Sequence, residues 1–491
     1  MNQLKPGTFE YYKQSSIRGV RWTGGAEIFS RLFQFAVNVL LARLLMPSDF
    51  GKIALALVVV KFIQLVIDFG VSSTLIQRRR VSADHYHTSF TLVVLFSLFF
   101  ALGVFLESDL VASILGNVEI SQVIKYLSIV VILNGINVLP RAYLTRKLNF
   151  RRIVAAEFIS TLFYGISTVI AAYILRNLWC FVIGLIVEQV VLGVFLWSFY
   201  GKLPRLSISY QAFKDLLNFS SFVFGTRLTN FFNLSILNIL INKFFGSYAL
   251  GIFSLSYQIV DLPTQRIAKN IMKVMYPILS KLQHSLAEYE KMILNSIFLI
   301  LVIILPFFAV LFLLAEPFVL LFFGEKWIST VPFLKILCVA GLVRSLWTVV
   351  SVISMSIGKP QFELFLNLGN GLFLITGIVL LSPLGMQIIV LYFTLLLAIF
   401  YCYGQYRVFR WINFAPARVI SELRGTILSN FILFASILAL TQFQLLDFIP
   451  QVSFKFVLLS ILSLIIYFWG LYFLDREGIS NLVKLIFKKE S

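Results

Sequence analysis

Several ionisable side chains fall inside long apolar stretches of this 491-residue sequence, namely Arg31, Lys61, Glu188, Asp261, Arg266 and Arg344. An ionisable group near the middle of a bilayer costs about 2.5–3.5 kcal/mol on insertion scales, so it normally faces protein or a water-filled cavity. We therefore expect the basic residues of this set to bind an anionic substrate. Glu188 and Asp261 are the expected sites of ion coupling.

The densest group of charges predicts a diphosphate site on one helix. Arg266, Lys269 and Lys273 follow at i, i+3 and i+7, which places them on one stripe of an α-helix. Asp261 and Pro263 precede them by one to two turns. The alternative is that Lys269 and Lys273 only mark the inner membrane interface. On the first helix, Glu27 and Arg31 are four residues apart and form either a structural ion pair or part of the binding site.

The sequence predicts neither a metal site nor a cofactor. The cysteines stand singly inside apolar runs, at positions Cys180, Cys338 and Cys402. His85 and His87, beside Asp84, supply only two imidazoles in a polar turn, which is weak evidence for a metal site. A Gly-rich loop ending in Lys-Ser/Thr is missing, so we expect that ATP does not drive this protein.

The composition shows what must position these charges. Of all residues 59% are apolar and only 13% are charged, whereas soluble domains have about 45–50% and about 25%. Long unbroken apolar runs such as 297–314 also differ from the alternating segments of a membrane β-barrel. The predicted fold class is an all-α integral membrane protein.

Apolar runs between charged or Pro/Gly punctuation predict about fourteen transmembrane helices. They lie near residues 22–45, 50–75, 88–106, 121–139, 153–174, 178–199, 219–241, 251–276, 291–314, 331–355, 362–381, 386–407, 425–443 and 454–474.

The basic residues of the connections predict the orientation. The net charge is +19, and roughly 24 Lys and Arg lie in connections on the side of the termini, against about three, Arg176, Lys243 and Lys326, on the other side. We therefore expect both termini in the cytoplasm. Most of the positive charge then serves topology and contact with anionic membrane lipids, which argues against a nucleic-acid partner.

An internal repeat predicts two parallel lobes. Residues 38–55, NVLLARLLMPSDFGKIAL, align without a gap over residues 238–255, NILINKFFGSYALGIFSL, and Gly51 then meets Gly251. A looser echo links 114–121 with 322–329, where Gly116 and Gly324 occupy related places. A displacement of 200 residues contains six predicted helices, so the copies enter the membrane in the same direction. In this register Lys61 corresponds to Asp261.

The predicted organisation is therefore six helices, six helices and a terminal pair, with alternating access between the two lobes. The expected segments are an N-terminal cytoplasmic segment (1–21), an N-lobe (22–200), a cytoplasmic inter-lobe connection (201–218), a C-lobe (219–407), a cytoplasmic connection (408–424), a helix pair (425–474) and a cytoplasmic tail (475–491).

Four segments carry a family resemblance. They are ARLLMPSDFGKIALALVVVKFIQLVIDFGVSSTLIQRRR (42–80), RAYLTRKLNFRRIVAAE (141–157), MYPILSKLQ (275–283) and AEPFVLLFFGEKWISTVPFLKIL (315–337). In this order they resemble polysaccharide flippases of the multidrug/oligosaccharidyl-lipid/polysaccharide (MOP) exporter superfamily, and most closely the exporters of the colanic acid and teichuronic acid type.

The resemblance implies a function. Such a protein would move an undecaprenyl-diphosphate-linked oligosaccharide repeat unit across the bacterial inner membrane, for export of capsular polysaccharide, exopolysaccharide or lipopolysaccharide O-antigen. Its partners would be that lipid-linked oligosaccharide, membrane lipids, and the polymerase and chain-length or export proteins of the pathway. The family offers no short catalytic motif, so the site residues named above rest on depth and charge alone.

Three alternatives remain open at this point. A peptidoglycan lipid flippase is chemically similar, and a drug or metabolite antiporter of the same superfamily would be expected to have twelve helices. A membrane enzyme of the same pathway, such as a polymerase or ligase, would usually need a sizeable outer loop. The connections here are all short, so we expect that the protein is not an enzyme.

Overall fold

The computed structural model describes residues 29–68, 71–77, 81–282, 285–442 and 452–474. Helices account for nearly all of this part of the chain, and no strand occurs in it. This architecture confirms the all-α prediction, and it follows from composition, because a backbone inside a bilayer must satisfy its hydrogen bonds within the helix.

Among the described residues, 11 helices are long and apolar enough to cross a membrane. They are Pro47–Asp68, Ala83–Leu106, Val118–Arg146, Phe150–Leu175, Trp179–Tyr200, Ser235–Pro263, Leu286–Leu313, Glu325–Ser356, Pro360–Leu384, Met386–Trp411 and Phe456–Leu474. Arg424–Leu440 is a shorter apolar helix. These helices make the chain a multi-pass membrane protein. Each predicted span overlaps a helix, whereas the count of fourteen spans stays a prediction.

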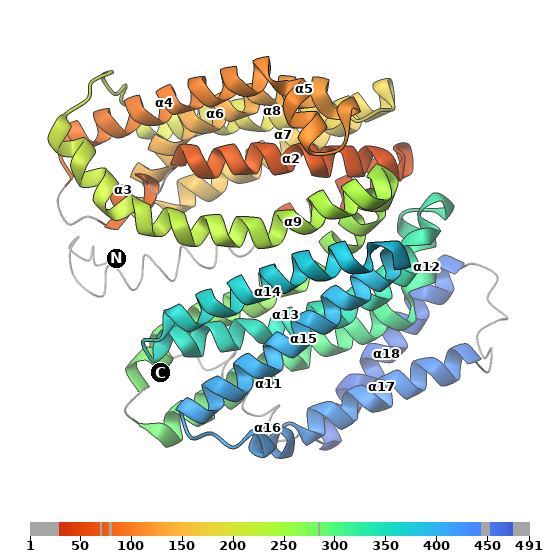
Figure 1. Cartoon of the computed structure of the whole chain (residues 1–491). Coiled ribbons are helices and arrows are strands. Elements are labelled where there is room, and N and C mark those ends of the chain that lie inside the picture. Colours follow the sequence, from red (N-terminus) through yellow and green to blue (C-terminus); the bar gives the residue numbers. More distant parts are fainter. Residues whose placement is uncertain (1–28, 69–70, 78–80, 283–284, 443–451, 475–491) are drawn as a thin grey trace, which may run out of the picture. The chain divides into compact units, whose positions relative to one another are not determined.

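The chain divides between Gly251 and Ile252 into two compact units. In the first unit α7 packs along α8, and α6 packs against α2, α4 and α8. Its elements are a helix at 29–44, α2 (Pro47–Asp68), α3 (Val71–Gln77), α4 (Ala83–Leu106), α5 (Ser108–Ile114), η1 (Val118–Ile120), α6 (Ser121–Arg146), α7 (Phe150–Leu175), α8 (Trp179–Tyr200) and the first part of α9 (Tyr210–Pro263) (Figure 1).

In the second unit α13 is the central helix, because α10, α11, α14 and α15 all pack against it. After the end of α9 its elements are η2 (Thr264–Ala268), α10 (Lys269–Leu282), α11 (Leu286–Leu313), α12 (Ala315–Phe322), η3 (Glu325–Thr330), α13 (Val331–Ser356), α14 (Pro360–Leu381), η4 (Ser382–Leu384), α15 (Met386–Trp411), α16 (Pro416–Glu422), α17 (Arg424–Gln442) and α18 (Val452–Leu474). The pair α17 and α18 packs together and contacts α11 (Figure 1).

The two units repeat the same order of elements. A long helix, a short helix, a 3₁₀ turn and three long helices occur as α4, α5, η1, α6, α7 and α8 in the first unit, and as α11, α12, η3, α13, α14 and α15 in the second. Apart from Gly246 in α9, the described residues with positive φ occupy the same connections in both units. They pair as Gly116 with Gly324, Leu148 with Gly358, Arg176 with Gly385, and Gly201 with Asn413. This correspondence bears out the predicted internal repeat and its echo at Gly116 and Gly324.

One predicted connection is much shorter than expected. The sequence placed Lys243 in a connection between helices at 219–241 and 251–276, whereas α9 continues through it and is interrupted only at Gly246, with φ 79° and ψ 176°. These angles are accessible essentially only to glycine. A single such residue breaks the helix without a loop. The related position Met46 in the first copy lies in a two-residue break between helix 29–44 and α2.

The glycines of the repeat lie against each other. A Cβ atom on Gly51 would collide with the Ser247 carbonyl oxygen and lie 2.9 Å from the Gly251 amide nitrogen. In the reverse direction, a Cβ atom on Gly251 would collide with the Pro47 carbonyl oxygen and lie 3.1 Å from the Gly51 nitrogen. The contact is therefore reciprocal, and both positions require glycine because two backbones approach there without side chains.

Candidate functional site

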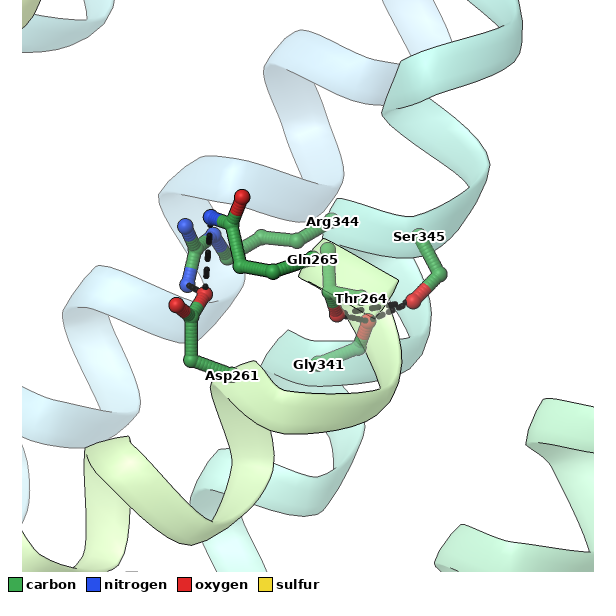
Figure 2. Close-up of polar contacts among 6 residues, drawn as sticks. All are labelled: Asp261, Thr264, Gln265, Gly341, Arg344 and Ser345. Atoms are coloured by element: carbon green, nitrogen blue, oxygen red, sulfur yellow. Dashed lines mark hydrogen bonds and ion pairs between the residues drawn. The ribbon is translucent and has the colours of Figure 1, made fainter. Parts of the chain in front are cut away.

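An ion pair inside a predicted span forms the centre of the candidate site. Arg344 of α13 donates through Nη1 to Oδ1 of Asp261 on α9, at 2.7 Å, with side-chain exposures of 17% and 25%. The guanidinium carbon also lies 4.9 Å from the centre of the Tyr257 ring. The Gln265 amide donates to the same Oδ1 at 3.3 Å, as Figure 2 shows.

A π-helical turn brings these groups together. Pro263 ends α9, and the five residues of η2 that follow, Thr264–Ala268, adopt π-helix. Proline lacks an amide hydrogen and its ring crowds the carbonyl of the preceding turn, so the α-helical ladder is disturbed there. Single π turns inside α-helices frequently lie at functional sites.

Three hydroxyl and carbonyl groups fasten this turn to α13 without any charge. The Thr264 hydroxyl lies 2.8 Å from the Ser345 hydroxyl and 3.2 Å from the Gly341 carbonyl oxygen, and Ser345 donates to the same carbonyl at 2.7 Å (Figure 2). Gly341 permits the close approach, since a Cβ atom there would overlap Val260 and Phe308. The position of the turn is therefore set by small residues and buried hydroxyl groups.

The π turn corrects one prediction. The stripe of Arg266, Lys269 and Lys273 assumed an uninterrupted α-helix, but Arg266 falls within η2 while Lys269 and Lys273 belong to α10. The α-helical spacing of i, i+3 and i+7 therefore does not hold across this segment. The Arg266 side chain lies outside the part of the structure that is described. The side chains of Lys269 and Lys273 are exposed.

Lys269 extends the charged group along α10. It lies within electrostatic range of Arg344, Asp261 and Glu363. Glu363, in the first turn of α14, accepts a hydrogen bond from Ser351 Oγ at 2.5 Å, while its Oε2 is buried and has no hydrogen-bond partner in the described structure. The charged groups thus comprise two cations and two carboxylates, contributed by α9, α10, α13 and α14.

The other predicted residues lie in the first unit. Arg31 is half-buried and donates to Gln34 Oε1 at 2.8 Å, whereas Glu27, its predicted alternative partner, lies outside the described residues. Glu188 is half-buried on α8, and the Lys61 side chain on α2 is exposed. Arg31 and Glu188 are both within electrostatic range of Glu157 on α7.

Sequence reasoning missed several of the partners that define the site. Tyr257, Asp261 and Gln265 are spaced four residues apart, so their common helix face was available from the sequence. Glu363 and Ser351 had no such signal, because they come from two helices.

The first unit also contains an ion pair that the sequence did not indicate, between Arg141 of α6 and Glu157 of α7.

The arrangement fits recognition of an anion at membrane depth. A guanidinium presents five donors in a planar fork that matches carboxylate and phosphate oxygens, and it stacks on aromatic rings. Arg344 is held in this way by the Tyr257 ring and one carboxylate oxygen. A second cation, Lys269, lies close enough to interact with the same anion.

Comparison with known proteins agrees with this description. The chain is 25% identical over 439 residues to the lipopolysaccharide biosynthesis protein WzxC of Escherichia coli (strain K12), covering 85% of this chain and 89% of that protein. It is 24% identical over 366 residues to the teichuronic acid biosynthesis protein TuaB of Bacillus subtilis (strain 168), covering 74% and 75%. The fold matches the lipid II flippase MurJ in its inward closed conformation with a TM-score of 0.74, at 13% identity, over 93% of this chain and 99% of that one.

Residues 40–332, more than half of the chain, match the family model described as polysaccharide biosynthesis protein. The match begins in the first repeat and continues past η3, so it includes Asp261 and the π turn. By this match the chain belongs to the polysaccharide biosynthesis protein family.

Proposed function

We propose that this protein is a flippase that translocates undecaprenyl-diphosphate-linked oligosaccharide repeat units from the inner to the outer leaflet. The observation that carries the proposal is the Arg344–Asp261 ion pair inside a span, in a chain of a polysaccharide biosynthesis family. A cation at membrane depth is by default a candidate functional site, and the diphosphate of a lipid-linked substrate is an anionic group that could bind there.

Two six-helix lobes would provide the movement. We assign the N-lobe to residues 22–200, the C-lobe to 219–407 and the additional helix pair to 425–474, and alternating access follows if the lobes rock about a central cavity. Arg31, Lys61, Arg266, Lys269 and Arg344 would bind the diphosphate. Glu188 and Asp261 would couple translocation to an ion. The repeated order of elements, α4 to α8 and then α11 to α15, supports two related lobes.

The proposed location is the bacterial inner membrane, with both termini in the cytoplasm. The excess of basic residues in the connections on that side supports this orientation. Substrate would be received from the enzymes that build it on the carrier lipid, and passed to polymerase and chain-length or export proteins. We propose no catalytic activity, because translocation changes no covalent bond.

The test is deletion of the gene in its native host, followed by complementation. We expect that the mutant accumulates the lipid-linked repeat unit on the cytoplasmic side and loses the surface polysaccharide, and that the wild-type gene restores both. The side is measured by the access of a membrane-impermeant oxidant to the sugars in spheroplasts. Accumulated repeat units that are accessible from outside would contradict the proposal and place the defect after translocation.

The fold match to a lipid II flippase favours one second candidate, a peptidoglycan lipid flippase. The two functions share the carrier diphosphate and differ in the sugar, so the decisive measurement is genetic. Rescue of cells depleted of their own lipid II flippase would support the second candidate. Failure to rescue, with restored polysaccharide in the deletion host, would support the first.

A further inference from the structure

The contacts of Arg344 suggest that its ion pair has a role other than holding the helices together. The π turn is already fastened to α13 by Thr264, Ser345 and the Gly341 carbonyl, and these buried contacts include no charged group. A partly buried ion pair contributes little net stability, since the desolvation of two charges offsets their attraction. The uncharged contacts hold the π turn against α13 without using the Asp261 carboxylate.

The binding capacity of the guanidinium is only partly used. Asp261 accepts one hydrogen bond from Nη1, through Oδ1 alone, and the same oxygen also accepts from Gln265. An arginine has five donors, and its strongest anion complexes are bidentate. Both side chains of the pair also retain solvent-accessible surface, 17% for Arg344 and 25% for Asp261. A single-oxygen contact at a partly exposed arginine side chain can be exchanged for a bidentate one.

The described side chains around the pair carry equal numbers of positive and negative charges. Arg344 and Lys269 are opposed by Asp261 and Glu363, and Lys269 interacts electrostatically with the other three. A diphosphate that entered this group would meet two carboxylates as well as two cations. Binding of the diphosphate is therefore favoured only if one of the two carboxylates moves away from the cations.

We propose that Asp261 is a built-in competitor for the anion subsite on Arg344, and that a phosphate group of the lipid-linked substrate displaces it. This inference rests on the proposed function and deepens it. Before substrate binds, the Asp261 carboxylate pairs with the Arg344 guanidinium, and the Gln265 amide holds the carboxylate in place. In the loaded protein the phosphate takes the guanidinium, Tyr257 keeps the fork in place, and the released carboxylate becomes available to a proton or a cation.

The experiment measures binding of undecaprenyl diphosphate, without sugars, to the full chain in lipid nanodiscs. Asp261→Asn removes the competing charge while keeping the shape of the side chain, and we expect roughly 10-fold tighter binding, because a charge left without its partner gains most from a new counter-ion. Arg344→Gln is expected to weaken binding by about the same factor. Gln265→Leu, which only loosens the carboxylate, is expected to tighten binding less than Asp261→Asn.

Two further variants separate direct competition from general electrostatics. Glu363→Gln removes a carboxylate of the same charged group that makes no hydrogen bond to Arg344, and direct competition predicts a smaller effect than for Asp261→Asn. Glu290→Gln, which breaks the 2.6 Å ion pair with Arg418 elsewhere in the second unit, is the matched control and should bind as the wild type does.

The outcomes distinguish the two levels of the proposal. If wild-type protein does not bind undecaprenyl diphosphate, the proposed function is wrong. If wild-type protein binds but Asp261→Asn and Gln265→Leu do not bind more tightly, only the competitor is wrong. Equal effects of Asp261→Asn and Glu363→Gln would also overturn it, in favour of long-range charge. Monodispersity and the melting temperature of each variant show whether it is folded, and Gln265→Leu tests the idea without touching either charge.

Discussion

The guanidinium of Arg344 is oriented by one helix face. Tyr257 supplies the ring and Asp261 the carboxylate, one turn apart on α9, and Gln265 follows a turn later. A fork that is already fixed loses little conformational freedom when a ligand arrives, which favours affinity. The shape of the arginine should therefore matter as much as its charge.

Substitution of Arg344 by lysine tests this expectation. Arg344→Lys keeps the charge but loses the planar fork and the stacking on Tyr257, so we expect roughly 3-fold weaker binding of undecaprenyl diphosphate, a smaller loss than for Arg344→Gln. The measurement is the nanodisc titration, with the export of polysaccharide in cells as a second readout. The matched control is Lys335→Arg on the same helix. If Arg344→Lys bound undecaprenyl diphosphate with wild-type affinity, the positive charge alone would account for the contribution of this residue.

Single residues of this site were predictable, whereas their pairing was not. Asp261 and Arg344 were selected because each is an ionisable group in an apolar stretch, a signal that needs no structure. Their contact spans 83 positions along the chain, and nothing local in the sequence encodes it. The register of the repeat related Asp261 to Lys61, which describes ancestry and does not identify the partner that Asp261 contacts, Arg344.

At the scale of elements, proline and glycine decide where the long helices change course. Pro263 precedes the π turn, and Gly246 breaks α9 at a backbone conformation with φ 79° and ψ 176°. The sequence prediction placed Pro263 ahead of the basic stripe and assumed regular α-helix beyond it. Apolar periodicity does not report the number of residues in each hydrogen-bonded turn, so the stripe of basic residues was placed on the wrong geometry.

Gly246 offers a clear test of these element boundaries. A side chain at Gly246 costs about 1–3 kcal/mol, because its φ and ψ are essentially restricted to glycine. We expect Gly246→Ala to lower the melting temperature of the detergent-solubilised protein. Gly103, which lies within helix α4, is the control, since a Cβ atom there would meet nothing within 4 Å. Gly103→Ala is expected to be neutral or stabilising by up to about 1 kcal/mol, and equal effects of the two changes would contradict the assignment.

At the scale of the whole molecule, the predicted orientation gives an independent check. Leu203, 88% exposed in the connection after α8, should face the cytoplasm, and Val118, 66% exposed at the start of η1, should face outward. In a variant without Cys180, Cys338 and Cys402, an impermeant maleimide should label Val118→Cys in intact cells. Leu203→Cys should react only after the membrane is opened. Labelling of both from outside would contradict the orientation.

The order of the long apolar helices was largely predictable from apolar length and from the charged, Pro and Gly residues between them, whereas the count of fourteen spans stays a prediction. The repeated elements were only partly predictable. The alignment of 38–55 with 238–255 related Gly51 to Gly251, and the backbones of these two residues lie against each other. The sequence comparison did not reveal that the other connections of the two units correspond, because their residue types differ.

The two units share backbone conformations at positions where their residue types differ. One unit has Leu148, Arg176 and Gly201 where the other has Gly358, Gly385 and Asn413, and each of these residues has positive φ. A comparison of residue identities scores every one of these positions as a mismatch. In this chain the repeat can therefore be followed through the positions of its left-handed residues, even where the residue types of the two units differ.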